Sequence, residues 1–244
     1  MDNGIGTGMY LTGGAYADGG LITVNNSGAD NNIGVFYSKG AVTAGVTNSS
    51  EISLKGNKSI GIYAADGIAL TNNAKIISSV GTNKNIASYV GEGSTLTSAD
   101  NIAMSGIEDI GIFVGDGTGI NIGTVDISGA TPATGSVTGM VAQADAGATA
   151  SIENKAIIEA GANLGMYIEG TGTSSGKNTG DIDVTTGTGV YLEGANASFD
   201  GTAGTITTRG TSTTETNGVG IYLKDTVTGA VADTGTLNIA LGGV

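Results

Sequence analysis

The sequence contains no cysteine, histidine or tryptophan, and it has one proline and one arginine among its 244 residues. The absence of cysteine excludes disulfide bonds, thiol catalysis and thiolate-bound zinc. The absence of histidine removes the commonest metal ligand and the usual general base. We therefore expect no cofactor and no metal site of the ordinary kind, and any catalysis would have to depend on carboxylates.

Basic residues are scarce as well. Nine lysine and arginine residues face 22 acidic ones, which gives a formal net charge of −13. Such a chain repels nucleic-acid phosphates and anionic lipids, and no basic patch offsets the repulsion. No stretch approaches the ~20 apolar residues that span a bilayer, and the start at Met1–Gly4 has no signal-peptide pattern. We therefore expect no nucleic-acid partner and no direct insertion into a membrane.

Glycine, in contrast, is abundant. The 45 glycines weaken any helix, whereas the many threonine, serine and asparagine residues suit turns and polar strand faces. An apolar fraction of 39% argues for a buried core and against a disordered chain.

One short phrase organises the whole sequence. It consists of a glycine, an apolar residue, an aromatic residue, another apolar residue and then small or acidic residues, and it recurs at intervals of 24 to 31 residues. A period in this range is typical of stacked units that share one core. The aromatic slot is occupied by Tyr10, Phe36, Tyr63, Tyr89, Phe113, Val141, Tyr167, Tyr191 and Tyr222, of which only Val141 is not aromatic.

Each unit contains three short runs that alternate with a period of two, separated by polar turns. In the unit around Phe113 the second run includes the apolar pair Ile120 and Ile122, and the third includes Val125 and Ile127. Neither a leucine scaffold nor a 3.6-residue period is present, which excludes leucine-rich and helical repeats. We predict an all-β chain folded as a right-handed parallel β-helix, with about nine coils of ~26 residues, three short strands per coil and a length of roughly 43 Å.

No internal boundary interrupts the repeats, so residues 1–244 form one β-helical segment. The last apolar pair, Leu237 and Ile239, stands close to the end of the chain with no capping element after it. Uncapped solenoid ends favour end-to-end association. This pattern predicts a segment of a longer rod, with end-to-end or lateral self-association.

Strand alternation assigns the two faces of the repeat. The residues directly before and after the aromatic slot should point inward, and the aromatic slot should point outward beside the glycine two positions earlier. The eight rings then form an external ladder, and they are our candidate binding residues. Two interpretations stay open: the rings stack on one another and cover the glycines, or they offer a surface to a sugar or a partner protein. An inverted assignment, with the rings inside, is the third possibility.

Two carboxylate pairs are candidate catalytic groups, because glycoside cleavage needs two carboxylates about 5 to 10 Å apart. Asp181 and Asp183 share one strand face, and Glu169 and Glu193 follow the aromatic slot by two positions in consecutive coils. No arginine, histidine or third carboxylate accompanies either pair in the sequence, so we expect a solvated acidic face. Asp116 lies in a Gly-Asp-Gly turn, but the nine-residue calcium repeat of β-rolls is missing.

Three polar stretches lengthen their coils, and insertions in a solenoid project from one side. We expect loops at Gly129–Ser136, Gly170–Lys177 and Gly210–Gly218.

The phrases Ser59–Ala64, Asp109–Val114 and Gly218–Leu223 resemble the passenger repeats of large type V autotransporter adhesins, especially the fusobacterial RadD-like outer-membrane proteins. The resemblance covers essentially the whole chain, but it is one of repeat style and transfers no binding residue. It implies a non-enzymatic adhesin segment on the extracellular side of the outer membrane, at the cell surface, that binds a glycan or protein of another cell. A carbohydrate-processing β-helix of the tailspike or lyase type, and a purely mechanical spacer, remain as alternatives.

Overall fold

The computed structural model describes residues 6–12, 19–25, 32–40, 45–130, 137–209, 218–224, 227–232 and 235–239. Within these ranges every regular element is a β-strand, and no helix is present that could cross a membrane. The predicted all-β class is confirmed.

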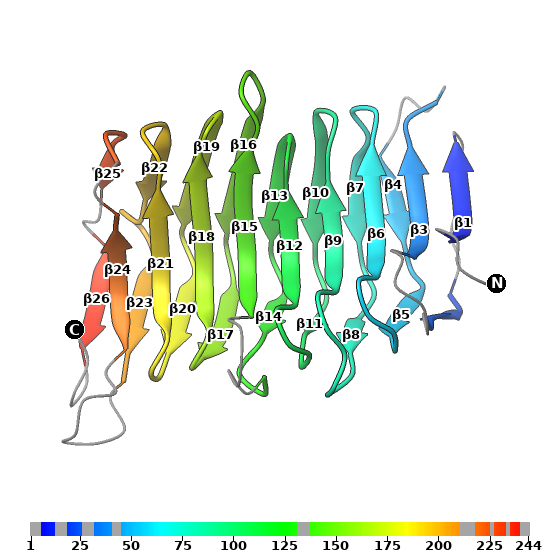
Figure 1. Cartoon of the computed structure of the whole chain (residues 1–244), viewed down its shortest axis with the longest axis horizontal. Coiled ribbons are helices and arrows are strands. Elements are labelled where there is room, and N and C mark those ends of the chain that lie inside the picture. Colours follow the sequence, from blue (N-terminus) through cyan, green and yellow to red (C-terminus); the bar gives the residue numbers. More distant parts are fainter. Residues whose placement is uncertain are drawn as a thin grey trace.

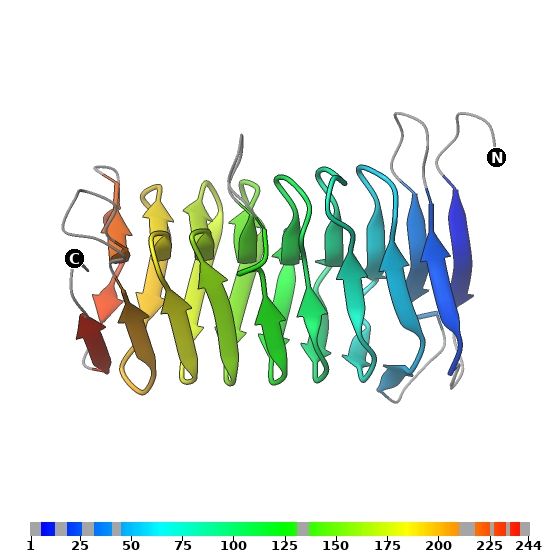
Figure 2. The same ribbon diagram turned by 90° about the horizontal axis from the view of Figure 1, so that it is seen from below.

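The chain winds as a parallel β-helix (Figure 1). Its strands form three parallel sheets of nine, eight and nine strands, and every hydrogen-bonded neighbour of a strand comes from the coil before or after it. Figure 2 shows the same coils side by side along one axis, from the N-terminal to the C-terminal part. Because the second sheet has eight strands, eight coils contribute to all three sheets in the part described, slightly fewer than the nine laps predicted.

The first sheet carries the aromatic slot. Its strands are β1 (Thr7–Thr12), β3 (Ile33–Ser38), β6 (Ile60–Ala65), β9 (Ile86–Val90), β12 (Ile110–Val114), β15 (Thr138–Ala144), β18 (Leu164–Gly170), β21 (Thr188–Glu193) and β24 (Val219–Leu223).

The other two sheets follow in each coil. The second sheet contains β4 (Val46–Asn48), β7 (Ala69–Asn72), β10 (Ser94–Ser98), β13 (Gly117–Asn121), β16 (Thr149–Asn154), β19 (Thr173–Asn178), β22 (Ala197–Asp200) and β25 (Val231–Ala232). The third contains β2 (Leu21–Val24), β5 (Glu51–Leu54), β8 (Ile76–Ser78), β11 (Ile102–Ala103), β14 (Thr124–Asp126), β17 (Ile157–Gly161), β20 (Asp181–Val184), β23 (Thr205–Thr208) and β26 (Thr236–Ile239).

The core lies on the axis, between the inner faces of the three sheets. On both sides of the aromatic slot the side chains are buried from the second coil to the eighth, as Ile62 and Ala64 show with no exposed surface. Ile76 and Leu70 meet them from the other two sheets. Burial of apolar area contributes roughly 25 cal/mol per Å², so this continuous inner column stabilises the fold. The inward assignment of these positions is confirmed.

The glycine two positions before the aromatic slot does not lie where we expected it. A Cβ on Gly61 would stand 3.3 Å from Ile76 Cγ2 in the core and 2.6 Å from the carbonyl oxygen of Ala87 in the next coil. Gly111 is placed in the same way against Val125, 3.0 Å away. The expected outward position beside the ring was therefore wrong. Gly61 lies inside β6 between the paired residues Ile60 and Ile62, and both Gly61 and Ile62 are buried, so two successive residues point inward and the alternation breaks.

The second strand of the fifth coil also differs from expectation. We expected Ile120 and Ile122 to be its apolar pair, but Ile122 is 46% exposed and the inward positions belong to Gly119 and Asn121. A Cβ on Gly119 would approach Val114 and Ile112 to 2.8 and 2.9 Å. The large side chains of the first sheet fill this space, so glycine faces inward and the isoleucines point away from the axis.

A buried amide ladder runs along the inner corner after the second sheet. Asn48 Nδ2 donates to Asn72 Oδ1 at 2.7 Å, Asn121 Nδ2 to Asn154 Oδ1 at 2.8 Å, and Asn154 Nδ2 to Asn178 Oδ1 at 2.8 Å. Each amide also donates to a backbone carbonyl nearby, as Asn72 does to that of Ala74 at 2.7 Å. The ladder satisfies polar groups that burial would otherwise penalise.

A second polar column holds the corner that leads into the first sheet. The backbone N–H of Ser59 donates to Asn85 Oδ1 at 2.9 Å, and that of Asn85 donates to Asp109 Oδ1 at 2.8 Å. Gly106 N–H donates to the other oxygen of Asp109 at 3.1 Å. Burial raises the pKa of the Asp109 carboxyl in spite of these hydrogen bonds. Side chains of one coil thus fix the backbone of the coil before it.

The amide ladder has one break, which generates a stability prediction. Ser98 stands in register between Asn72 and Asn121, and its buried hydroxyl has no hydrogen-bond partner. Ser98→Asn should join the two halves of the ladder and raise the free energy of unfolding by about 0.5 to 1.5 kcal/mol. Urea denaturation measures the change.

Two variants control this experiment. Asn154→Ala removes a ladder member with partners on both sides and should destabilise the chain by about 1 to 3 kcal/mol, because buried polar groups lose their partners. Ser98→Ala measures the effect of losing the hydroxyl alone. If Ser98→Asn were less stable than Ser98→Ala, the proposed continuity of the ladder would be refuted.

Candidate binding surface

The eight predicted rings stack on the outer face of the first sheet. We call them the aromatic ladder. Its first run joins Tyr10, Phe36, Tyr63, Tyr89 and Phe113, with neighbouring ring centroids 4.6 to 5.2 Å apart and planes within 12 to 18° of parallel. Its second run joins Tyr167, Tyr191 and Tyr222, with centroids 5.5 and 4.9 Å apart. The outward direction of the rings and their mutual stacking are both confirmed.

Stacking decides which part of each ring a partner can reach. In the first run the rings face one another along the axis, so their faces are covered by their neighbours and their edges point to solvent. The inner rings are only partly exposed, whereas the terminal rings Tyr10 and Tyr222 are 62% and 47% exposed. A flat platform of ring faces, which our binding interpretation assumed, is therefore not available along the stacked first run.

The rings do cover glycines, but different ones from those expected. A Cβ on Gly91 would stand 3.1 Å from the ring of Tyr89, and one on Gly115 would stand 3.0 Å from the hydroxyl of Tyr89. These glycines follow the aromatic slot by two positions, where the strand still points outward. At the break between the two runs Val141 is only 3% exposed. A small side chain there thus ends the stack without leaving an open slot.

A row of acidic residues borders the ladder at the ends of the first-sheet strands. It includes Asp66, Glu92, Asp116 and Asp145 in the turns that follow these strands. The Ser38 hydroxyl donates to Asp66 and lowers the pKa of its carboxyl, whereas hydrogen bonding with Asp66 raises the pKa of Glu92. The row gives this border of the ladder a negative potential.

The predicted pair Glu169 and Glu193 continues this border in the second run. The two residues are in register on adjacent strands, as expected, and Tyr167 Oη lies 3.4 Å from Glu169 Oε2 and 3.2 Å from Glu193 Oε2. Gln143 also donates to Glu169, and Lys224 forms an ion pair with Glu193 that lowers the pKa of this carboxyl. Gln143 and Lys224 were missed in the sequence, although each stands one repeat interval from its partner.

The second predicted pair, Asp181 and Asp183, has an arginine partner that we did not expect. Arg209 Nη1 lies 2.7 Å from Asp183 Oδ2 on the outer face of the third sheet, so the expectation that no arginine accompanies this pair was wrong. A third carboxylate, Glu159, stands in register beside Asp183, while Asp181 is exposed at the start of the same strand. A cavity of about 200 Å³ is lined by Ser128, Glu159, Gly161, Asp183, Thr185 and Arg209.

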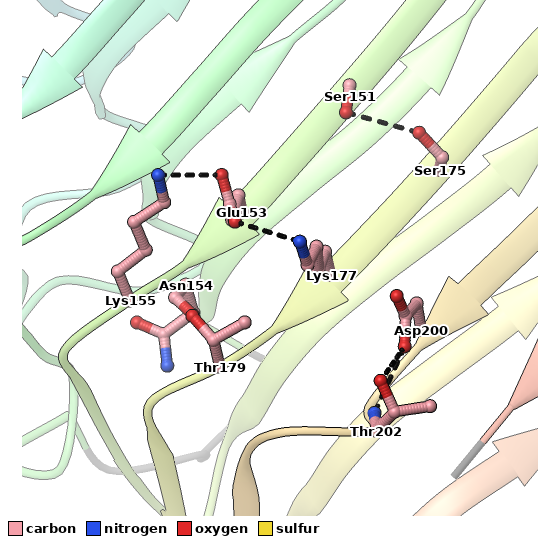
Figure 3. A network of polar contacts seen from close by, with 9 residues as sticks. All are labelled: Ser151, Glu153, Asn154, Lys155, Ser175, Lys177, Thr179, Asp200 and Thr202. Carbon is pink, nitrogen blue, oxygen red and sulfur yellow. Dashed lines mark hydrogen bonds and ion pairs between the residues drawn. The ribbon is translucent and has the colours of Figure 1, made fainter.

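The outer face of the second sheet carries most of the remaining ion pairs (Figure 3). Glu153 lies between two lysines, with Lys155 Nζ at 3.1 Å and Lys177 Nζ at 3.5 Å. Ser175 Oγ donates to Ser151 Oγ at 3.2 Å in the neighbouring coil. Exposed pairs of this kind contribute little to stability, about 0 to 1 kcal/mol each. This face is a balanced polar surface, unlike the border of the ladder.

The predicted loops have different outcomes. Most of Gly129–Ser136 and of Gly210–Gly218 lies outside the described residues. The stretch Gly170–Lys177 is not a loop, because Thr173–Asn178 forms β19 and the backbone at Gly176 lies close to Ile168 in the core. Glycine and serine at the inward positions of β19 concealed the strand in the sequence.

Neither a metal centre nor a known relative assigns a role to these surfaces. In the part of the chain that the structure describes, no three acidic, histidine or cysteine side chains are grouped so that they could hold a metal ion. No family model, no curated protein and no solved structure matches the chain.

The geometry of the ladder predicts that its rings stabilise one another. Tyr63 and Tyr89 have the closest centroids, 4.6 Å apart, and a double-mutant cycle with Tyr63→Leu and Tyr89→Leu should give a coupling energy of about 0.5 to 1.5 kcal/mol. Tyr63 and Tyr191 belong to separate runs, so their cycle should give less than about 0.5 kcal/mol. Urea unfolding of the single and double variants measures both, and equal couplings would contradict the structural role of stacking.

The tyrosine hydroxyls should make the stability of the fold depend on pH. Burial, together with neighbouring carboxylates, raises the pKa of Tyr63, Tyr89 and Tyr167. The neutral phenol is thus favoured in the folded state, and this contribution to stability is present below the unfolded pKa of about 10 and is lost as the pH rises through the folded-state values. In an absorbance titration, Tyr167→Phe should remove a phenol that ionises at a higher pH than an ordinary tyrosine. The free energy of unfolding of this variant should fall less at alkaline pH than that of the parent chain. If Tyr167→Phe instead removed a phenol with the ordinary tyrosine pKa, the raised pKa of Tyr167 would be contradicted.

Proposed function

We propose that this chain is a non-enzymatic segment of a cell-surface adhesin. In this proposal it is a stiff β-helical stalk on the extracellular side of an outer membrane, and it presents loops and the aromatic ladder to a glycan or protein of a host or bacterial cell. The observation that carries the proposal is the outward ladder on an axial core that continues from coil to coil. The resemblance to autotransporter passenger repeats supports the same location.

Stiffness follows from how the coils are joined. Every strand inside the stack pairs with strands of both adjacent coils in all three sheets, and the amide ladder adds side-chain hydrogen bonds between coils. Bending such a rod would open hydrogen bonds along one side and compress the packed core on the other, which is resistant to compression. A stalk that holds a binding surface away from a membrane needs this resistance.

The two predicted carboxylate pairs favour a non-enzymatic role. Glycoside cleavage requires a general acid with a raised pKa beside a second carboxylate. Lys224 instead lowers the pKa of Glu193, and Asp183 is paired with Arg209. Glu193 and Asp183 each form an ion pair with a basic side chain, which suits polar contacts better than proton transfer.

A mechanical spacer is the second candidate function, and the covered ring faces favour it.

Adhesion assays distinguish the adhesin from the spacer. Beads coated with the chain should bind cells that display surface glycans or proteins, and the binding should fall after treatment of the cells with glycosidases or proteases. Beads coated with a β-helix of unrelated sequence are the control. If the two kinds of bead bound alike, the adhesin proposal would be wrong and the spacer would stand; release of reducing ends from cell polysaccharide, lost in Glu193→Gln, would instead indicate an enzyme.

A further inference from the structure

A groove of about 430 Å³ runs beside the second run of the aromatic ladder. The rings of Tyr167 and Tyr191 line it together with Asn163, Thr186 and Thr188. We infer that this tyrosine groove binds one unit of a neutral saccharide. The inference rests on the proposed adhesin function and assigns its ligand class and its site.

One repeat position differs in residue type at the groove. The residue three positions before the aromatic slot points outward next to the ring, and it is isoleucine in four consecutive coils, at Ile33, Ile60, Ile86 and Ile110. In register with them, the next three coils have Thr138, Leu164 and Thr188, of which Leu164 and Thr188 line the groove. Threonine is shorter than isoleucine and carries a hydroxyl group. Space and a hydrogen-bonding group therefore appear together beside Tyr191.

The rings at the groove are also arranged differently from the others. Tyr167 and Tyr191 are tilted by 41° with centroids 5.5 Å apart, whereas the other described ring pairs are within 19° of parallel. Tyr167 has Val141 and not a ring in the preceding coil. Its stacking is thus incomplete on both sides. Val141 leaves no open slot, so it is the tilt between Tyr167 and Tyr191 that turns ring surface toward the groove, where the apolar face of a sugar can contact it.

Polar groups in the wall complete the requirements of a saccharide site. Thr186 and Thr188 supply hydroxyls that both donate and accept. Asn163 is 2% exposed and stabilises the wall from inside, because its Nδ2 donates to the carbonyls of Ile127 and Ala130 at 2.8 and 3.1 Å. Ligand sites typically combine aromatic walls with a few polar groups in about 300 to 1,000 Å³, and the tyrosine groove fits this description.

Charge selects a neutral ligand. No residue in the described lining is charged, so the groove offers no counter-ion to an acidic sugar, and the net charge of −13 repels one. Glu169 and Glu193 contact the hydroxyl of Tyr167, but they stand past the rings, where the strands end, and do not line the groove. A neutral hexose or N-acetylhexosamine carries no charge and has hydroxyl groups and an apolar face, so it suits this groove.

The test uses the whole chain and a panel of methyl glycosides of neutral hexoses and N-acetylhexosamines at millimolar concentration. In nitrogen-15 correlation spectra, at least one glycoside should shift the amide signals of Thr186, Gly187 and Thr188 with saturable dependence on concentration. Thr188→Ile should weaken this binding about tenfold or more, which corresponds to about 1.4 kcal/mol. The fold already accepts isoleucine at the same position in four other coils, so this variant fills the groove and keeps the ladder.

The matched control is Thr97→Ile. Thr97 points outward on the second sheet in register with Ile120, so the same substitution is made far from the rings and should leave binding unchanged. Tyr191→Phe should retain binding and Tyr191→Leu should lose it. The inference would be overturned if no glycoside shifted these signals, if Thr188→Ile bound as well as the parent chain, or if only acidic sugars or aromatic peptides bound. Cell adhesion that survives in Thr188→Ile would overturn the tyrosine groove alone, whereas lack of adhesion by the parent chain would overturn the adhesin proposal.

Discussion

This structure depends on the pairing of each strand with the equivalent strand of the next coil. In the described residues the register is constant except for one shift, between Glu159 and Gly161 in β17. Adjacent parallel strands lie about 4.8 Å apart, so a residue type that recurs at the repeat interval is placed on top of itself. Tyr63 stacks on Tyr89, and Asn154 bonds Asn178. The same translation produces an aliphatic column inside, an amide ladder at a corner and an aromatic ladder outside. Each ladder stabilises the register that creates it, because a slip would separate every pair at once.

Constant register does not require a constant repeat length. The interval is 24 residues between Tyr89 and Phe113 and 31 between Tyr191 and Tyr222, yet both pairs are aligned and stacked. The difference in length falls in the segments between the paired strands. This freedom explains why the phrase around the aromatic slot is conspicuous in the sequence while the spacing between phrases is not uniform.

The sequence was sufficient to predict the three sheets, the inward positions beside the aromatic slot and the outward ladder, because these follow from the period and from strand alternation alone. It was insufficient where alternation breaks. Gly61 was assigned to the wrong face because two successive residues of β6 point inward, and Ile120 because the core of that coil was already filled. The partners of Asp183 and Glu193 could have been found: Arg209 follows Asp183 by 26 residues and Lys224 follows Glu193 by 31, which are repeat intervals. The tilt of the rings and the groove depend on side-chain packing, which the spacing of the repeats does not predict.

A regular ladder leaves little of itself for a partner. Each ring inside the first run has its two faces covered by neighbouring rings, and Asn154 has amide partners in the coils on both sides. Where the repeated residue changes, the ladders are interrupted: Ser98 leaves an unpaired hydroxyl, and Thr188 lines a groove. In a solenoid whose stability comes from repetition, recognition must come from departures from it. The departures at Val141 and Thr188 both lie beside Tyr167 and Tyr191, which is why we place recognition there and not along the regular first run.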